Sequence, residues 1–421
     1  MTLAPHIDTQ ILHAQLAAMG RLGAENGPGR TRLALTDADR AGRDLLVSWL
    51  HALDLDIHID AVGNIYGILQ PAPAQRHLPA LVIGSHIDTV NEAGAYDGCY
   101  GVLAGVAVLR ALRAAGVTPT RPVAVVAFSN EEGVRFQPDM LGSLAVAGGI
   151  SLAEVHALVG TDGATFGAEL ARIGYLGANA PGALPLHAYL ELHIEQGPIL
   201  DAEGIAIGAV HTLQGISWQR ITLHGTANHA GTTPLHLRHD PAVVAAQVIA
   251  AVRAHCRASE STVATVGTFA VSPSAINVIP HTATFTLDLR DPDHANLAAA
   301  EAFVAATLAD YAAAEGVTVT VERLARFEPV NFDSGLVQTI QAAAAARGFT
   351  CRPMVSGAGH DAQMMARVCP SAMIFVPSRA GISHNPAEYT SPDQLDAGVA
   401  VLADVVSRCL ALTEGLPYAH R

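Results

Sequence analysis

"RPVAVVAFSNEEG" (residues 121–133) is the stretch that decides the fold. Its apolar run from Val123 to Phe128 has the length of a buried strand and ends in a serine, an asparagine and two glutamates. Carboxylates at the tip of a buried strand are costly to dehydrate unless they are paired or bind a metal. The stretch therefore raises the question of whether Glu131 and Glu132 have the same role.

Three more apolar runs end in the same way. They are "LPALVIGSHIDTV" (78–90), "AYLELHIEQG" (188–197) and "SAMIFVPS" (371–378). An apolar core followed by polar residues at the carboxyl edge is typical of strands in an α/β sheet. Helical spacing of apolar residues predicts helices between the strands, over 8–56, 101–116 and 391–412, with Ser391 as a candidate N-cap of the last.

The middle of the chain has a different pattern. Between residues 213 and 330 the segments read as strand, helix, strand, strand, helix, strand. This is the split βαβ order of a ferredoxin-like α+β domain. We therefore expect an inserted domain over 213–330, and a first domain built from 1–212 together with 331–421.

Composition excludes several classes of protein. The chain has 421 residues, of which 50% are hydrophobic, and a formal net charge of −14. Such a charge argues against nucleic acid and against an anionic membrane surface as partners. The first residues show no basic stretch followed by an apolar run, so no signal peptide is predicted. No segment approaches the roughly 18 consecutive apolar residues of a membrane helix. The five cysteines are scattered without a CxxC pair, which indicates free thiols in a cytoplasmic protein.

Polar residues at the predicted strand ends form one candidate constellation. They are His86, Asp88, Asp97, Glu131, Glu132, His193, Glu195, Gln196 and His384. Imidazoles mixed with carboxylates suit zinc, and manganese, nickel or cobalt in similar geometry. A single ion needs about three protein ligands, so this set is nearly enough for two. Asp97, on a short side chain between glycines, is the natural residue to bridge them.

Each of these residues also has an ordinary explanation. Asp97 precedes a predicted helix and could be its N-cap. His193 could lie on the polar face of a half-buried strand, His384 in a surface loop, and the glutamate pair at a solvated helix start. Their joint occurrence at predicted strand ends is what favours a metal site over these separate explanations.

The motifs "GSHIDTV", "GAYDGCYGVLAG", "SNEEGVRF", "LHIEQGP", "HAGTTP" and "ISHNPAE" resemble those of the hydantoinase/carbamoylase amidases. These amidases form a branch of the dinuclear-metal aminoacylase and carboxypeptidase superfamily, and the resemblance runs from about residue 10 to 412. It implies an α/β exopeptidase-like catalytic domain with a mixed sheet flanked by helices. It also implies that the inserted ferredoxin-like domain is a lid and dimerisation domain.

The resemblance assigns roles to the residues at the strand ends. One divalent ion would be held by His86, Asp97 and His193, and a second by Asp97, Glu132 and His384. Asp88 would fix the ring of His86 by accepting its other N–H. Glu131 would be the general base that takes a proton from the attacking water. On this reading the two adjacent glutamates have different roles.

A second set of residues comes from the inserted domain. By the resemblance, His229 stabilises the oxyanion, Asn277 and Arg290 grip the substrate carboxylate with Gln196 nearby, and His229 and Asn277 act across a homodimer interface. Arg290 could instead pair with Asp288 or Asp291, and His229 could be an ordinary turn residue.

Two further segments stay open on the sequence alone. The glycine-rich turn at Gly357 could present backbone N–H groups to an anion or only cap a helix, with His360 and Asp361 either lining the pocket or not. His236 and His239 are expected at a solvated helix start rather than on a metal.

The function that this resemblance implies is hydrolysis of the ureido C–N bond of N-carbamoyl-L-amino acids by a cytoplasmic homodimer. Allantoate amidohydrolase and β-ureidopropionase are alternatives within the same branch. A dinuclear aminopeptidase or dipeptidase is an alternative from another enzyme class. The segments around Gln196 and His229 favour the amidase branch over these peptidases. A metal-loaded binding protein on the same fold is the alternative outside enzymes, and it would not need Glu131 as a base.

Overall fold

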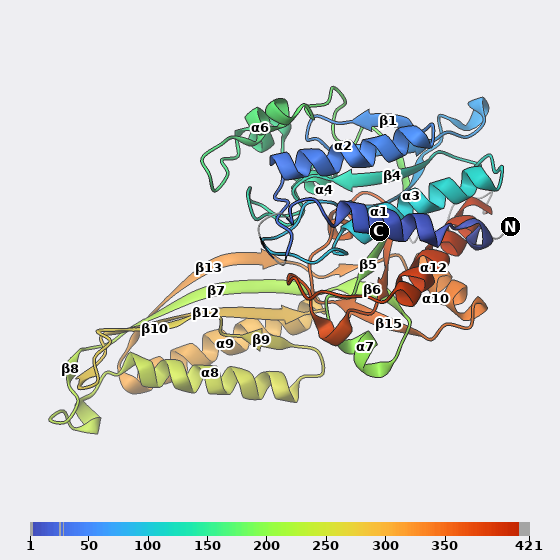
Figure 1. The fold of residues 1–421 in the computed structure, drawn as a ribbon. Coiled ribbons are helices and arrows are strands. Elements are labelled where there is room, and N and C mark those ends of the chain that lie inside the picture. Colours follow the sequence, from blue (N-terminus) through green and yellow to red (C-terminus); the bar gives the residue numbers. More distant parts are fainter. Residues whose placement is uncertain (1–2, 25–26, 28, 412–421) are drawn as a thin grey trace. The chain divides into compact units, whose positions relative to one another are not determined.

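The structure is a computed structural model that describes residues 3–24, 27 and 29–411. The chain divides into two compact units (Figure 1). The described residues within 1–211 and 331–421 form unit 1, and residues 212–330 form unit 2.

The centre of unit 1 is a set of parallel strands. In spatial order they are β4 (Val123–Phe128), β3 (Ala80–His86), β5 (Leu186–Ile194) and β16 (Ser371–Val376). These are the four apolar runs that the sequence predicts as strands, and nearly all of their residues are buried. Because neighbouring strands are parallel, their carboxyl ends meet at one edge of the sheet.

Antiparallel strands extend this sheet on both sides. On one side lie β2 (Ile65–Leu69) and β1 (Asp56–Ile59), and on the other β6 (Ile207–Leu213), β14 (Val330–Asn331) and β15 (Cys351–Ser356). Strand β2 is antiparallel to β4, and β6 is antiparallel to β16. The sheet is therefore mixed, which confirms the predicted fold class.

Helices pack on this sheet. The longer ones are α1 (Thr9–Met19), α2 (Asp37–Ala52), α3 (Cys99–Ala114), α10 (Ser334–Ala346) and α12 (Pro392–Ala411). The shorter ones are α4 (Leu141–Val146), α5 (Leu152–Ala157), α6 (Phe166–Ile173), α7 (Ile199–Glu203) and α11 (Asp361–Met365), with single turns η1 (Ala4–His6), η2 (Pro73–Gln75) and η4 (Arg379–Gly381). Helix α3 packs on β3, β4 and β5 and is buried along most of its length, so it anchors the turn that carries Asp97.

The predicted helical range 8–56 is wrong, whereas the range 391–412 agrees with the structure as far as residue 411. Residues 8–56 are not one helical region, because the glycine-rich segment after Gly20 separates α1 from α2, and β1 begins at Asp56. The helix predicted over 391–412 is α12, whose start is capped reciprocally: Ser391 N–H donates to Gln394 Oε1 and Gln394 N–H donates to Ser391 Oγ. Residue 412 lies outside the described residues.

Unit 2 has the predicted order of strands and helices, except that the first strand predicted after α8 (Pro241–Ala258) is divided into two short strands. Its elements are β7 (Gly215–His224), α8 (Pro241–Ala258), β9 (Val263–Thr265), β10 (Phe269–Ser272), β12 (Thr282–Asp291), α9 (His294–Glu315) and β13 (Thr318–Phe327). The spatial order β10-β12-β7-β13 with antiparallel neighbours is a ferredoxin-like arrangement. A two-stranded ribbon of β8 (Asn228–His229) and β11 (Val278–Ile279), and the turn η3 (Leu235–Leu237), complete the unit.

Helix α9 is the one helix of the described residues that is long and apolar enough to cross a membrane. Leu297, Val304 and Leu308 lie on one face of this helix, where they are buried in the core of unit 2 with Phe285. Helix α8 packs beside it, and both helices contact the sheet. Packing within unit 2 therefore accounts for the apolar residues on this face of the helix.

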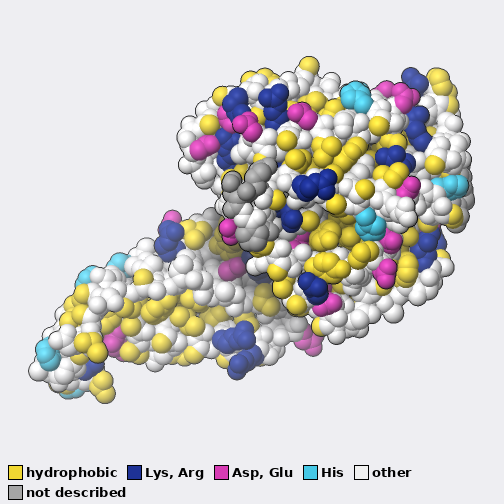
Figure 2. Space-filling view, viewed as in Figure 1, with side chains coloured by type: hydrophobic (Ala, Val, Ile, Leu, Met, Phe, Trp, Pro, Cys, Tyr) yellow, Lys and Arg dark blue, Asp and Glu magenta, His cyan; other side chains and the backbone are white. Residues whose placement is uncertain are grey.

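Apolar side chains also lie on the surface of unit 2 (Figure 2). Trp218, Phe269 and Val321 on its sheet are among the exposed large apolar residues, and so are Leu235 and Ile276 near the β8–β11 ribbon.

Candidate active site

The carboxyl edge of the parallel strands gathers the predicted metal ligands. His86 is the last residue of β3, and His193 lies one residue before the end of β5. Glu132 follows β4, and His384 follows β16 through the turn η4. Asp97 comes from the turn between β3 and α3. Side chains that are far apart in the sequence meet here because parallel strands end on the same side of the sheet.

Asp97 stands at the centre of this cluster. Its Oδ1 lies 3.2 Å from His193 Nε2 and 3.6 Å from His86 Nε2, and its Oδ2 lies 3.2 Å from His384 Nε2. His384 Nε2 is in turn 3.5 Å from Glu132 Oε2. The ligand atoms form two groups, each within 4.8 Å: His86, Asp97 and His193, and Asp97, Glu132 and His384. Each oxygen of Asp97 faces a different group.

Hydrogen bonds fix the tautomers of two of these histidines. His86 Nδ1 lies 3.0 Å from the carbonyl oxygen of Asp88, and His193 Nδ1 lies 2.8 Å from that of Ile194. A carbonyl oxygen can only accept, so both rings carry a proton on Nδ1. In the neutral rings each Nε2 then carries the lone pair, which is the form that binds a metal. The Nε2 of His193 accepts the backbone N–H of Gly98 at 3.1 Å. The residues present therefore fit divalent cations.

The role expected for the Asp88 carboxylate is not the one observed. Its backbone carbonyl, not its carboxylate, accepts the N–H of the His86 ring. The carboxylate instead accepts the backbone N–H groups of Glu131 and Glu132. A carboxylate that accepts two amides stabilises the turn after β4, so Asp88 holds both the histidine and the glutamate pair in place.

The two adjacent glutamates have different neighbours. Glu131 Oε2 lies 3.4 Å from His86 Nε2, whereas Glu132 Oε2 lies 3.5 Å from His384 Nε2. Both line a cavity of about 150 Å³ together with His86, Asp97, Asp139, Gln196, Ala358, Gly359, His360 and His384. The two adjacent glutamates therefore differ in position, because Glu131 approaches the His86 group and Glu132 approaches the His384 group.

The ionisable groups of this cavity have strongly shifted pKa values. Burial raises the pKa of Glu131 well above its usual value, with nearby carboxylates such as Asp361 adding to the effect. Burial, followed by the charge of Asp97, raises the pKa of Glu132 to about 8. The hydrogen bond from His384 to Asp97 raises the pKa of His384 to about 9. Buried carboxylates at this density need positive charge beside them, which protons on the histidines or metal cations supply.

The turn that carries Asp97 can lie this close to the His86 ring only because residue 98 is a glycine. The backbone of Gly98 has φ of 61°, and a Cβ at this position would lie 2.4 Å from His86 Nε2. Gly98→Ala should displace the His86 ring and weaken the binding of the cation between His86 and His193 by about tenfold or more. Titration of the chelator-treated protein with Mn²⁺ measures this.

Gly116→Ala is the matched control for the Gly98 substitution. Gly116 follows the other end of α3, also has positive φ (65°), and has nothing within 4 Å of an added Cβ. It should lower stability by about 1 kcal/mol without changing cation binding. Equal cation affinity in Gly98→Ala and wild type would contradict the assigned position of His86.

Other predicted residues of unit 1 divide into those that face the cavity and those that do not. Gln196 faces the cavity, and its Nε2 donates to Asp97 Oδ2 at 2.8 Å. Gly357 is exposed, and its neighbours Ala358 and Gly359 line the cavity. Glu195 does not belong to the cluster, because its carboxylate accepts the N–H groups of Ile199 and Leu200 at the start of α7.

The sequence leaves open whether His360 and Asp361 line the pocket, and the structure places only His360 at the cavity. His360 lines the cavity and its ring contacts Ser356 Oγ. Asp361 is buried outside the cavity lining and accepts a hydrogen bond from Ser143. Glu191, which the sequence reasoning missed, lies with His193 and His360 in a third group of possible ligands. Its oxygens already accept from Ser85 Oγ and from the backbone N–H of Ala362, so we assign no cation there.

His229 and Asn277 lie together on the β8–β11 ribbon of unit 2. Both are exposed, and the Ala230 N–H donates to the Asn277 carbonyl. His229 Nδ1 accepts from the backbone N–H groups of Gly231 and Thr232 at 3.1 and 3.2 Å. The proton of a neutral His229 ring is therefore on Nε2, where it can be donated to an anion.

Arg290 lies at the end of the five-stranded sheet that is remote from the β8–β11 ribbon. It donates to the carboxylate of Asp288, one of the two partners that the sequence offers as an ordinary explanation. Strand pairing places Arg290 opposite Ile216, and Thr282, near the β8–β11 ribbon, opposite His224. At about 3.3 Å per residue, the eight steps along β7 separate these ends by roughly 26 Å. Side chains at these two ends of the sheet are therefore too far apart to contact the same small molecule.

The remaining predicted histidines of unit 2 show no cation site. His239 Nδ1 contacts the carbonyl oxygen of Glu315 at 2.8 Å, close to the start of α8. His236 lies in the exposed turn η3. Among the described residues, neither belongs to a group of possible metal ligands.

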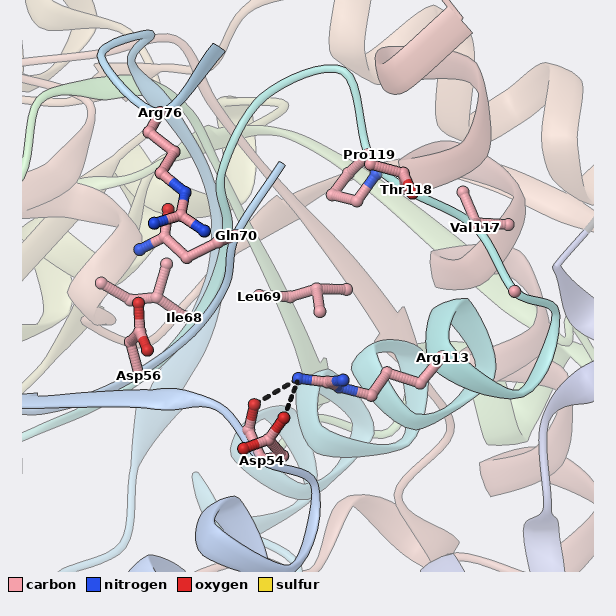
Figure 3. A pocket seen from close by; sticks show the side chains of 11 residues that line it. Asp54, Asp56, Ile68, Leu69, Gln70, Arg76, Arg113, Val117, Thr118 and Pro119 are labelled. Atoms are coloured by element: carbon pink, nitrogen blue, oxygen red, sulfur yellow. Dashed lines mark hydrogen bonds and ion pairs between the residues drawn. The ribbon is translucent and has the colours of Figure 1, made fainter. Parts of the chain in front are cut away.

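A larger hollow in unit 1, of about 450 Å³, lies away from this cluster (Figure 3). It is lined by β1, the end of β2 and the loop after α3, and Arg113 donates there to Asp54. Its charged groups are exposed and of both signs, and no histidine lines it. Its size does not make it the active site, since the grouped ligands are at the smaller cavity.

Comparison with known proteins agrees with this geometry. The sequence model of Peptidase family M20/M25/M40 matches residues 82–408. An N-carbamoyl-L-amino-acid amidohydrolase of Rhizobium meliloti is 38% identical over 97% of this chain and 98% of its own length. The chain belongs to the M20/M25/M40 family. The members of this family are metal-dependent, as the cluster leads one to expect.

Within the M20/M25/M40 family, the chain is similar to the hydantoinase/carbamoylase amidases. The crystal structure of one from Burkholderia multivorans is 41% identical, with a TM-score of 0.91 over 96% of this chain and 98% of that chain. An allantoate amidohydrolase of Bacillus subtilis is 33% identical over 92% of this chain and 94% of its own length. The resemblance carried by the six motifs is confirmed.

Proposed function

We propose that the protein hydrolyses the ureido C–N bond of N-carbamoyl-L-amino acids with two divalent cations per subunit. The observation that carries the proposal is the position of Asp97, with one oxygen towards each group of ligands. Zinc is the expected ion, and manganese, nickel or cobalt would suit the same donors. Free, mostly buried cysteines support a cytoplasmic location.

His86, Asp97 and His193 would hold one cation, and Asp97, Glu132 and His384 the other. Bound there, the cations polarise the ureido carbonyl and lower the pKa of the attacking water. Asp97 sets the spacing of the two groups, and the Nδ1 hydrogen bonds of His86 and His193 hold their rings in the ligating orientation.

Glu131 is the general base of the proposed reaction. It lies at the cavity but on the His86 side, so its carboxylate remains available for a water proton. It takes one proton from the water that attacks the ureido carbon and passes it to the departing nitrogen. The C–N bond to that nitrogen breaks and leaves a carbamic acid. The carbamic acid transfers its hydroxyl proton to the second nitrogen as the other C–N bond breaks, so the products are the amino acid, ammonia and carbon dioxide.

Unit 2 is the proposed lid and dimerisation domain. Arg290, whose Nε and Nη2 donate to Asp288 in the structure, would present its guanidinium to the substrate carboxylate, with Asn277, Gln196 and the backbone at Gly357 as further contacts. His229 donates its Nε2 proton to the oxyanion. Closure of the lid over the cations would exclude bulk water from the reaction.

The length of the sheet in unit 2 supports the proposed homodimer. Along β7, the end of the sheet that carries Arg290 and the end near the ribbon of His229 are roughly 26 Å apart, so a site that needs both residues would take one from each of two chains. Exposed Leu235 and Ile276 beside the ribbon of His229 supply apolar surface for contact with a second copy.

Arg290→Ala should impair carboxylated substrates selectively. We expect kcat/KM for N-carbamoyl-L-methionine to fall about 100-fold, the loss expected when a charged hydrogen-bonding partner is removed. The slow hydrolysis of the corresponding carboxamide should hardly change. Arg220→Ala, which removes an exposed ion pair with Glu322 from the same sheet, is the control. Equal losses on both substrates in Arg290→Ala would show that Arg290 does not bind the carboxylate.

Mixing two inactive variants tests whether the site is shared between subunits. In a heterodimer of Arg290→Ala and His229→Ala chains, one site carries both defects and the other carries neither. Random reassociation makes half of the dimers mixed, so about a quarter of wild-type activity should return. Activity no higher than that of the parent variants would contradict a shared site.

A substrate panel separates the candidate functions. The protein reconstituted with metal is assayed on N-carbamoyl-α-amino acids, N-carbamoyl-β-alanine, allantoate and a dipeptide. We expect the highest kcat/KM on an N-carbamoyl-L-amino acid. Allantoate is the second candidate, since a relative of that name matches almost the whole chain. A preference for the dipeptide would reject the proposed function.

A further inference from the structure

Glu388 is a buried carboxylate beside the cluster, and the proposed mechanism gives it no role. It is only 6% exposed, and it lies four residues after His384 in the loop between η4 and α12. It is not a member of any group of possible cation ligands among the described residues. A buried carboxylate next to Asp97 is electrostatically unfavourable, so its presence calls for a compensating contact.

The contacts of Glu388 connect two loops. Its Oε1 accepts the backbone N–H groups of Tyr96 at 2.8 Å and Asp97 at 3.3 Å. Its Oε2 accepts from Ser383 Oγ at 3.0 Å, and the same hydroxyl lies 3.2 Å from Asp97 Oδ2. The carboxylate thus spans from the turn that carries Asp97 to the residue before His384.

His384 needs such support more than the other predicted ligands do. Its side chain is 49% exposed, so packing does not hold it, and its backbone has φ of 52°. His86 and His193, by contrast, are buried and hydrogen-bonded through Nδ1. The second group of ligands therefore depends on loop geometry, whereas the first is built on strands.

Gly94 gives independent support, because it makes room for this carboxylate. A Cβ at Gly94 would lie 2.2 Å from both the carboxyl carbon and Oε1 of Glu388. Glu388 and the turn before Asp97 can approach this closely only without a side chain at that position.

We propose that Glu388 is a positioning residue that sets the distance between Asp97 and His384, and so the affinity of the second cation. The inference rests on the proposed two-cation function and adds a residue to it. Glu388 acts through the backbone of Asp97 and through Ser383, and it touches neither the substrate nor a cation.

The test is a titration of the full-length, chelator-treated protein with Mn²⁺ by calorimetry. Wild type should bind two ions. Glu388→Ala should bind the tighter ion as wild type does, and the dissociation constant of the weaker ion should rise about tenfold or more. Glu388→Gln should restore most of the affinity, because its Oε1 can still accept both backbone amides. Ser383→Ala, a smaller change that serves if Glu388→Ala does not fold, should weaken the second ion severalfold.

Glu195→Ala is the matched control. Glu195 is also buried and also accepts two backbone amides, but these belong to α7 and not to a ligand loop. It should leave both affinities unchanged. Two ions of wild-type affinity in Glu388→Ala and in Ser383→Ala would overturn the positioning role while leaving the two-cation proposal intact. Fewer than two ions in wild type would instead reject the proposed function itself.

Discussion

Glu131→Gln is expected to retain both cations and to lose at least about a thousandfold in kcat, the loss typical of a missing general base. Glutamine has nearly the shape of glutamate, and the backbone N–H at this position keeps its bond to Asp88. The amide cannot take a proton from water. Metal analysis after dialysis and steady-state kinetics on N-carbamoyl-L-methionine measure the two effects.

The neighbouring residue provides the control for this experiment. Glu132→Gln changes the same functional group one residue away, but Glu132 faces His384 in the second group of ligands. It should lose cation affinity as well as turnover, and added metal should restore part of its activity. Glu131→Gln with near wild-type turnover would remove the base from the mechanism.

Asp97→Ala is expected to lose both cations and all measurable turnover. No other described residue contributes to both the His86 and the His384 group. Without the carboxylate, the two pairs that remain, His86 with His193 and Glu132 with His384, each fall below the three ligands that a catalytic ion usually has. The expected metal content after dialysis is close to zero.

Asp139→Asn is the matched control for the loss of Asp97. Asp139 lines the same cavity but belongs to no group of possible ligands among the described residues. It should keep two cations per chain. If Asp97→Ala also kept two, the bridging role of this carboxylate would be wrong.

The central sheet was predictable from sequence, and its edges were not. Long apolar runs mark β3, β4, β5 and β16 because strands buried on both faces need no polar residues. Strand β1 has no such signal, since its residues alternate between exposed and half-buried, and β14 has only two residues. Short edge strands are set by pairing with the strand beside them, which a local pattern does not record.

The side chains at the strand ends were predictable as a group but not in their individual contacts. Parallel strands bring His86, His193 and Glu132 together whatever the details of the turns. Whether a carboxylate in such a turn faces a cation or accepts backbone amides depends on the local path of the chain. Asp88, Glu195 and Glu388 all accept backbone amides, and no spacing in the sequence distinguishes them from Asp97.

Anomalous X-ray diffraction from crystals grown with zinc tests the paired cation centre most directly. Two peaks about 3.5–4 Å apart are expected. One should lie within about 2.0–2.3 Å of His86, Asp97 and His193, and the other within that distance of Asp97, Glu132 and His384. A single peak, or two peaks that Asp97 does not bridge, would contradict the account.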